Sequence, residues 1–200
     1  VTMTGKTQRQ KATLIHTPHG FAGCDEAGRG PLIGDVVAAA VLFHGKPPEG
    51  IRDSKKCSAK ERADLFAAIC ACAHVGIGHA TAEEIDALNI HHATLLAMKR
   101  AIDALQCDIL GVIVDGKFTP PCAVTALAEP KADDRYLEVA AASIIAKHRR
   151  DDMMRDLDRQ FPQYGFAQHK GYPTKAHREA IQTFGALPQH RQSFRGVKMS

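Results

Sequence analysis

Short apolar runs and longer amphipathic stretches alternate along the chain. Runs bounded by Gly, Pro or Asp are typical of buried strands, and they lie at residues 21–24, 35–43, 75–80, 109–114 and, more weakly, 123–127. Apolar residues at helical spacing predict helices, which lie at residues 58–71, 82–89, 92–105, 134–159 and 174–185. Strands interleaved with helices predict an α/β fold in which helices flank a mixed central sheet.

Two of the predicted helices begin with the same polar motif. Ser58 is followed three residues later by Glu61, and Thr81 is followed in the same way by Glu84. In such a capping box the hydroxyl and the carboxylate each accept a hydrogen bond from an amide that has no partner within the helix. The motif therefore marks both helix starts.

Length and composition favour one globular domain. The chain has 200 residues, of which 44% are hydrophobic and 24% are charged, and a chain of this size buries a core without disulfides or metals. We expect a flexible leader at residues 1–19 and a single domain at residues 20–200, with a helical C-terminal extension from about residue 160. No apolar run approaches the roughly 20 residues of a membrane helix, and no secretory signal is visible. We therefore expect a cytoplasmic protein without membrane association, a monomer, whose six scattered cysteines are reduced and buried.

The charge distribution says more than the net charge of +4 and the pI of about 8.8. Lys and Arg gather at residues 52–60, 147–150 and 170–195, whereas acidic residues follow the strand-like runs. An acidic centre with a basic surround suits an enzyme that uses a metal on nucleic acid. Solvated protein faces show the same pattern, so the distribution alone does not decide the function.

Carboxylates at the strand ends are the main candidates for chemistry. Asp25 and Glu26 end the first strand, Asp115 ends another, and Asp133 or Asp134 begins the long helix. Clustered carboxylates repel one another, and divalent cations with a preference for oxygen, such as Mg²⁺ or Mn²⁺, remove that repulsion. Two such ions can activate water for phosphodiester hydrolysis. Taken singly, each acid is better explained as a cap or turn residue.

The adjacent acids Asp25 and Glu26 pose a geometric problem. Neighbouring residues of a strand point to opposite faces, so both side chains cannot reach one site in regular β conformation. Either Glu26 lies in the turn, or one of the two residues binds a metal through its backbone carbonyl.

Three other segments could bind phosphate or sugar. Gly28-Arg29-Gly30 combines close backbone approach with a planar guanidinium, although most such loops are only turns. Ser143 and Lys147 share a helix face, where they either contact phosphate or are an exposed Lys and a helix-packing Ser. The loop at residues 53–56 is equally well a phosphate-binding loop or a charged turn. Residues 161–174 mix aromatic side chains with His and Lys, which suits stacking on a sugar or base but equally suits a loop pinned to the core.

Together these motifs resemble bacterial type 2 ribonuclease H, the ribonuclease HII family, from about Phe21 to Lys198. The motifs that carry the resemblance are Asp25-Glu-Ala-Gly-Arg-Gly-Pro31, Asp53-Ser-Lys-Lys56, Asn89-Ile-His-His-Ala-Thr94, Val114-Asp-Gly116, Lys131-Ala-Asp133, Ala140-Ala-Ala-Ser-Ile-Ile-Ala-Lys147 and His169-Lys-Gly-Tyr-Pro-Thr174. The resemblance implies a ribonuclease H-like fold with a helical C-terminal extension. It also implies two Mn²⁺ or Mg²⁺ ions at the active site, on four acids: Asp25, Glu26, Asp115 and Asp133.

The resemblance also implies a substrate and its contacts. The substrate is an RNA–DNA hybrid, or duplex DNA that contains ribonucleotides, cut on the 5′ side of a ribonucleotide to leave 3′-OH and 5′-phosphate ends. Gly28, Arg29 and Gly30 would read the 2′-OH, and Tyr172 would pack on the next sugar. The residues expected to hold the backbone are Lys55, Lys56, Ser143, Lys147 and Lys170, and His169 is a candidate for moving protons. The implied roles are ribonucleotide removal and primer clearance.

Departures from the family pattern and rival functions remain to be weighed. Ala132 stands where Gly is usual, Asp35 where a small residue or Pro is usual, and Cys57 where Leu is usual; residues 148–150 are more basic than the common pattern. The rivals are a junction resolvase with a similar acidic centre and a non-catalytic nucleic-acid-binding protein. The related type 3 enzymes are disfavoured because no further substrate-binding domain fits before Phe21.

Overall fold

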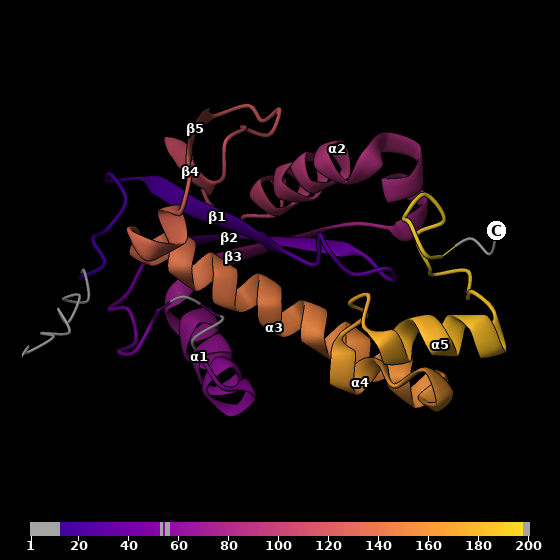
Figure 1. Ribbon diagram of the computed structural model, residues 1–200. Helices are drawn as coiled ribbons and strands as arrows, with labels where there is room; N and C mark the ends of the chain where they lie inside the picture. Colours follow the sequence, from indigo (N-terminus) through magenta and orange to yellow (C-terminus); the bar gives the residue numbers. More distant parts are fainter. Residues whose placement is uncertain (1–12, 53, 55–56, 198–200) are drawn as a thin grey trace, which may run out of the picture.

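A mixed sheet of five strands forms the centre of the described chain. The computed structural model describes residues 13–52, 54 and 57–197. Its strands follow the spatial order β3-β2-β1-β4-β5 (Figure 1). β2 pairs antiparallel with β1 and β3, whereas β1, β4 and β5 run parallel. The strands are β1 Phe21–Ala27, β2 Val36–Phe43, β3 Ala73–Ala80, β4 Gly111–Asp115 and β5 Thr125–Glu129.

Helices cover both faces of this sheet, which confirms the predicted α/β layers. α2 lies on one face, and α1 and α3 lie on the other (Figure 1). The helices are α1 Ala59–Cys72, α2 Ala82–Asp103, α3 Leu137–Gln160, α4 Phe166–His169 and α5 Lys175–Phe184, with 3₁₀ turns η2 Ala132–Asp134 and η3 Pro162–Tyr164. No helix in the described part of the chain is both long and apolar enough to cross a membrane.

The position of β2 between helices on both faces of the sheet explains why its sequence is apolar without alternation. Ala38 and Ala40 pack toward α2, whereas Ala39 and Val41 pack toward α1 and α3. Since successive side chains of a strand point to opposite faces, a strand covered on both sides must be apolar at every position. β2 is buried from Val36 to Val41 for this reason.

Two helix predictions need correction. The predicted helices at 82–89 and 92–105 form a single element, α2, that is kinked at Asn89, whose φ is 68°. The Asn89 carboxamide oxygen accepts hydrogen bonds from the amides of His91 and His92, so it caps the second half as an N-cap residue does. α3 begins at Leu137 rather than at residue 134, because the preceding residues form the turn η2 after Lys131, whose φ is 63°.

Smaller differences lie at the strand ends, between the last two predicted helices and in the expected flexible leader. β4 and β5 each begin and end later than predicted, and β3 begins two residues earlier, at Ala73. Between the helices predicted at 134–159 and 174–185, the chain forms the short helical elements η3 and α4. In the expected flexible leader, Ile15 bridges to Tyr136 and the Thr17 amide donates to the buried Glu138 carboxylate at 2.8 Å. That part of the leader is therefore fastened to the start of α3.

The expectation of six buried thiols is wrong. Of the six cysteines, only Cys24 and Cys57 are buried. Cys70 is exposed because it lies on the solvent side of α1, and the other three are partly exposed.

Two buried histidines join α5 to the C-terminal segment. His177 Nδ1 donates to the Tyr172 carbonyl at 3.0 Å, because a carbonyl can only accept. His177 Nε2 therefore accepts from His190 Nε2 at 3.2 Å, and His190 Nδ1 accepts from the Leu187 amide at 2.8 Å. All four ring nitrogens are used while both rings are neutral. Burial accordingly lowers the pKa of each imidazole to about 4.

Gly23 in β1 sets how closely α3 approaches the sheet. A Cβ at this position would lie 2.3 Å from the Glu138 carbonyl carbon and from the Val139 nitrogen. Both are backbone atoms that cannot rotate away, so only Gly allows this contact.

We expect Gly23→Ala to destabilise the protein by about 2 kcal/mol or more, since α3 must move away from β1. Urea unfolding followed by circular dichroism measures the change. Gly45→Ala is the control, because a Cβ there would meet its nearest neighbour at an ordinary 3.4 Å. Equal midpoints for the two variants would contradict this account of the packing.

We expect the pH dependence of stability to reflect the histidine pair. The folded-state pKa of about 4 lies below the ordinary value of 6.5, so the unfolded chain binds more protons between these values. Stability is fully present above pH 6.5 and is lost as the pH falls toward 4. Urea unfolding at pH 7, 6 and 5 checks this. His177→Gln should flatten the profile, whereas the exposed control His92→Asn should leave it unchanged.

Candidate active site

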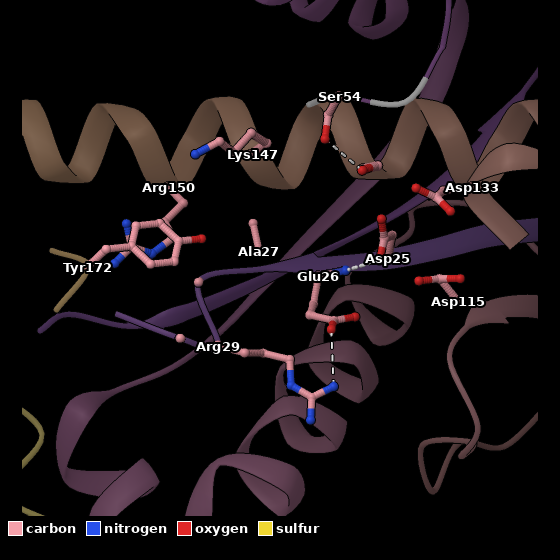
Figure 2. Close-up of a pocket in the computed structure, with 13 residues that line it drawn as sticks. Asp25, Glu26, Ala27, Arg29, Ser54, Asp115, Asp133, Lys147, Arg150 and Tyr172 are labelled. Atoms are coloured by element: carbon pink, nitrogen blue, oxygen red, sulfur yellow. Dashed lines mark hydrogen bonds and ion pairs between the residues drawn. The ribbon is translucent and has the colours of Figure 1, made fainter. Parts of the chain in front are cut away.

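A cavity of about 350 Å³ opens where β1 and β4 end (Figure 2). It brings together side chains from the sheet, from η2 and from α3. The lining residues are Asp25, Glu26, Ala27, Gly28, Arg29, Gly30, Ser54, Asp115, Asp133, Ser143, Lys147, Arg150 and Tyr172. All four predicted acids and the whole Gly-Arg-Gly loop are therefore at one site.

Parallel pairing of β1 with β4 places Asp25 and Asp115 side by side. Cys24 pairs with Val114, so the next residues, Asp25 and Asp115, lie beside each other where β4 ends, while β1 continues to Ala27 along β2. The Asp115 carboxylate accepts a hydrogen bond from the Ala132 amide at 2.8 Å, which ties η2 to the end of β4. Asp133 is the next residue of that turn and thereby joins the cavity.

Ala132 is compatible with this arrangement although Gly is usual there. Its side chain is fully buried against Ile113 and Val139. The left-handed conformation in this turn is taken by Lys131, and Ala132 is not among the described residues with positive φ. The replacement therefore needs no strained backbone.

Glu26 lies inside β1, paired with Ala38, and not in the turn that the sequence left open. Its side chain extends toward Arg29, and its carboxylate accepts from Arg29 Nη1 at 3.4 Å (Figure 2). Asp25 accepts from the Glu26 amide at 2.7 Å. Of the two geometric alternatives, the turn position of Glu26 is wrong, and metal binding through a backbone carbonyl stays a prediction.

Burial makes the ionised acids costly in this cavity. It raises the pKa of Asp25 well above its usual range, and the charges of Glu26 and Asp115 raise it further, against an opposing hydrogen bond from Ser143. Burial also raises the pKa of Glu26, partly offset by Arg29. A cation in the cavity would remove both costs.

The donor set fits a hard divalent cation, although the side chains do not form a finished cage. Carboxylate oxygens from Asp25, Glu26, Asp115 and Asp133 are the ligands that Mg²⁺ and Mn²⁺ favour. Among the described residues no three His, Cys, Asp or Glu side chains are grouped closely enough to hold a metal ion by themselves. Water and phosphate oxygens would complete the coordination, as is usual for Mg²⁺.

A network around Asp151 positions the basic wall of the cavity. Its carboxylate accepts from Lys147 at 2.7 Å and from Arg62 at 3.1 Å. Arg62 also donates to the Ser54 carbonyl at 3.1 Å, and the Ser54 hydroxyl lies 2.9 Å from that of Ser143. The loop at residues 53–56 thus reaches the site through Ser54, and its binding of phosphate stays a prediction. The predicted Lys55 and Lys56, with Asp53, lie outside the described residues.

The Gly-Arg-Gly loop requires its first glycine. Gly28 has φ 95°, and a Cβ there would lie 2.2 Å from the buried Arg150 Nε. The aromatic ring of Tyr172 lies against Gly30, 3.3 Å from where a Cβ would be. Arg150 and Tyr172 therefore line the same side of the cavity as the loop (Figure 2).

Two residues predicted to contact the substrate are not among those that line the cavity. His169 donates through Nε2 to the Tyr164 carbonyl at 2.8 Å and accepts from the Gly171 amide at Nδ1. Lys170 has φ 53°, and its carbonyl accepts from Arg150. Both residues shape the turn that carries Tyr172.

Sequence reasoning missed Ser54 as an individual lining residue, and Arg150 entirely. Arg150 follows Ser143 and Lys147 at helical spacing, so the three share one face of α3, and this spacing was the available signal. A single sequence otherwise does not distinguish a buried arginine from the exposed ones.

Comparison with known proteins gives consistent matches over almost the whole chain. Residues 22–197 match the family model described as Ribonuclease HII. The chain is 52% identical to a Ribonuclease HII of Shewanella woodyi, with 97% of this chain and 95% of the relative covered, and 48% identical to one of Aliivibrio fischeri, with 98% and 97% covered.

Solved structures agree with the sequence matches. The ribonuclease HII of Archaeoglobus fulgidus, solved in a complex with PCNA, has a TM-score of 0.73 at 26% identity, covering 90% of this chain and 97% of that one. The ribonuclease H2 of Pyrococcus horikoshii has a TM-score of 0.71 at 27% identity, covering 88% and 94%. A Bst-RNase HIII in complex with Mn²⁺ shares the fold, with a TM-score of 0.70 at 17% identity, covering 89% and 68%.

We expect Asp25→Asn to stabilise the metal-free protein by about 1 kcal/mol, because it removes a buried carboxyl group whose ionised form is disfavoured. Thermal unfolding in a chelator measures this. Mn²⁺ should then stabilise the unaltered protein more than the variant. Asp64→Asn, in an exposed ion pair with Lys60, is the control and should change little. An Asp25→Asn variant with lower stability in the chelator and an equal response to Mn²⁺ would contradict the assignment.

Proposed function

The chain belongs to the ribonuclease HII family and is an endoribonuclease, and from this membership we propose a specific reaction. It hydrolyses the RNA strand of RNA–DNA hybrids and cuts on the 5′ side of ribonucleotides within duplex DNA, leaving 3′-OH and 5′-phosphate ends. The observation that carries the proposal is the single cavity in which four acids face a Gly-Arg-Gly loop.

The acids Asp25, Glu26, Asp115 and Asp133 would hold two divalent ions, Mn²⁺ or Mg²⁺. When bound, such ions neutralise the phosphate and lower the pKa of water at the scissile bond. The chain's own part is to fix the oxygens: the Ala132 amide orients the Asp115 carboxylate, and the Glu26 amide orients that of Asp25. Asp25 is buried, whereas Glu26, Asp115 and Asp133 are partly exposed and can be reached from the cavity.

Recognition of the ribonucleotide falls to the opposite side of the cavity. Gly28, Arg29 and Gly30 present their backbone to the cavity, and a 2′-OH is both donor and acceptor, so it can bind backbone amides and carbonyls. The half-exposed Tyr172 ring beside Gly30 would pack on the following sugar. Deoxyribose lacks the hydroxyl, and this absence would leave the polar groups without a partner.

Basic and hydroxyl groups would hold the phosphate backbone along α3. Ser143 and Lys147 line the cavity, and the carboxylate of Asp151 keeps the Lys147 ammonium in place. We include Lys170, with Lys55 and Lys56, in this role because the chain is basic around the acids. We assign no proton transfer to His169, since both of its ring nitrogens are already hydrogen-bonded.

The same reaction suggests where the protein acts. Nucleic acid containing ribonucleotides would be its partner, and ribonucleotide removal and primer clearance would be its roles in the cytoplasm. We propose that it works as a monomer, since the cavity is built from one chain.

Cleavage of a duplex with one embedded ribonucleotide tests this function. With Mn²⁺ or Mg²⁺ we expect a single cut 5′ to the ribonucleotide, and we expect Asp133→Asn to lower the rate at least about 100-fold, as loss of a metal ligand does. Asp134→Asn is the matched control, because the neighbouring carboxylate is not among the residues that line the cavity. Cutting of an all-DNA four-way junction, with the ribonucleotide duplex left intact, would establish the rival resolvase.

A further inference from the structure

The side chain of Arg191 is fully buried directly behind the Gly-Arg-Gly loop. Its Nη2 donates to the Gly28 carbonyl at 2.6 Å, and its Nη1 donates to the carbonyls of Arg29 and Pro31 at 2.9 and 2.7 Å. Its Nε donates to the Gly34 carbonyl at 2.9 Å. One guanidinium from the C-terminal segment thus binds four carbonyls of one loop.

These bonds determine which way the loop's amides point. A trans peptide group is planar, with its carbonyl and its N–H on opposite sides, and the described chain has no cis peptide bond. The Gly28 carbonyl shares a peptide group with the Arg29 amide, and the Arg29 carbonyl shares one with the Gly30 amide. Since both carbonyls point at Arg191, both amides point away from it. Arg29 and Gly30 line the cavity on that other side.

The amides also differ in whether they are used. In the described structure those of Leu32 and Gly34 donate to the carbonyls of Gly171 and Gln189. No hydrogen bond among the described residues has the amide of Arg29 or Gly30 as its donor. The loop therefore has its carbonyls satisfied by Arg191 and two adjacent amides available to a ligand.

The segment that carries Arg191 is itself firmly held. The Arg191 amide donates to the Leu32 carbonyl at 2.8 Å, and the Arg191 guanidinium lies 5.1 Å from the ring centre of Phe194. The amides of Gln192 and Ser193 both donate to the Asp86 carboxylate on α2 at 2.8 Å. Arg191 therefore acts as a fixed template for the loop.

We propose that Arg191 is a positioning residue for substrate specificity, which orients the amides of Arg29 and Gly30 toward the ribose 2′-OH. The proposal rests on the proposed function. Lysine cannot replace it, because a single ammonium cannot span four carbonyls as the planar fork does. The role is distinct from catalysis, since Arg191 is not among the residues that line the cavity.

Binding to two matched duplexes tests the proposal. One contains a single ribonucleotide and the other is all DNA, and affinities are measured by fluorescence anisotropy in EDTA so that no cleavage occurs. The ratio of the two Kd values is the readout. We expect the unaltered protein to prefer the ribonucleotide, and Arg191→Lys to reduce that preference about tenfold. Arg191→Met should abolish it.

A matched control separates positioning from loss of stability. Met98→Ala creates a cavity in the core under α2, away from the loop, and should lower stability without changing the ratio of Kd values. If Arg191→Lys also keeps the ratio, the proposal is overturned while the proposed function stands. If the unaltered protein shows no preference in binding or in cleavage, the proposed function itself fails.

Hydrogen exchange of the unaltered protein gives a second test that does not depend on the folding of a variant. We expect the amides of Arg29 and Gly30 to exchange more slowly when the ribonucleotide duplex is added than when the all-DNA duplex is added. Equal exchange with both duplexes would overturn the proposal.

Discussion

Parallel pairing of β1 with β4 is the interaction on which the site depends. Because both strands end at the same edge, Asp25 and Asp115 meet there without any loop having to carry them. The price is repulsion between buried carboxylates, which the fold tolerates by tying each one to a backbone amide. The remaining parts of the cavity, η2, α3 and the Gly-Arg-Gly loop, are arranged around that edge.

Around the acids, buried arginines bind carbonyls. Arg191 and Arg150 donate to backbone oxygens at the loop and at the Tyr172 turn, and Arg62 does the same near Ser54 while also meeting Asp151. Had Arg191 and Arg150 paired with the carboxylates of the cavity instead, they would have neutralised the negative charge that could hold a cation. Their planar guanidiniums instead donate to backbone carbonyls, so these arginines lie close to the acids without pairing with them.

The sequence predicted the parts of the site that follow from local pattern. Asp25 and Asp115 end apolar runs, so their place at a sheet edge follows from strand prediction alone. Asp133 could be chosen over its neighbour only through the family motif, because a turn of three residues decides which carboxylate joins the cavity. The contacts of Arg191 lie 157 to 163 residues away, and no periodicity within one segment reveals such a partner. The kink at Asn89 was likewise visible as an interruption but not as a bend within one helix.

Arg191 comes long after the Gly-Arg-Gly loop in the sequence, and this order matters while the chain is being synthesised. During synthesis the neighbouring strands β1, β2 and β3 emerge first and can pair locally, whereas β4 must wait for a long crossover. The residue that organises the loop after β1 leaves the ribosome more than 150 residues later than the loop itself, since its bond to Gly28 spans 163 positions. A nascent chain therefore carries Asp25, Glu26 and the loop that follows them long before it carries the arginine that binds the loop's carbonyls.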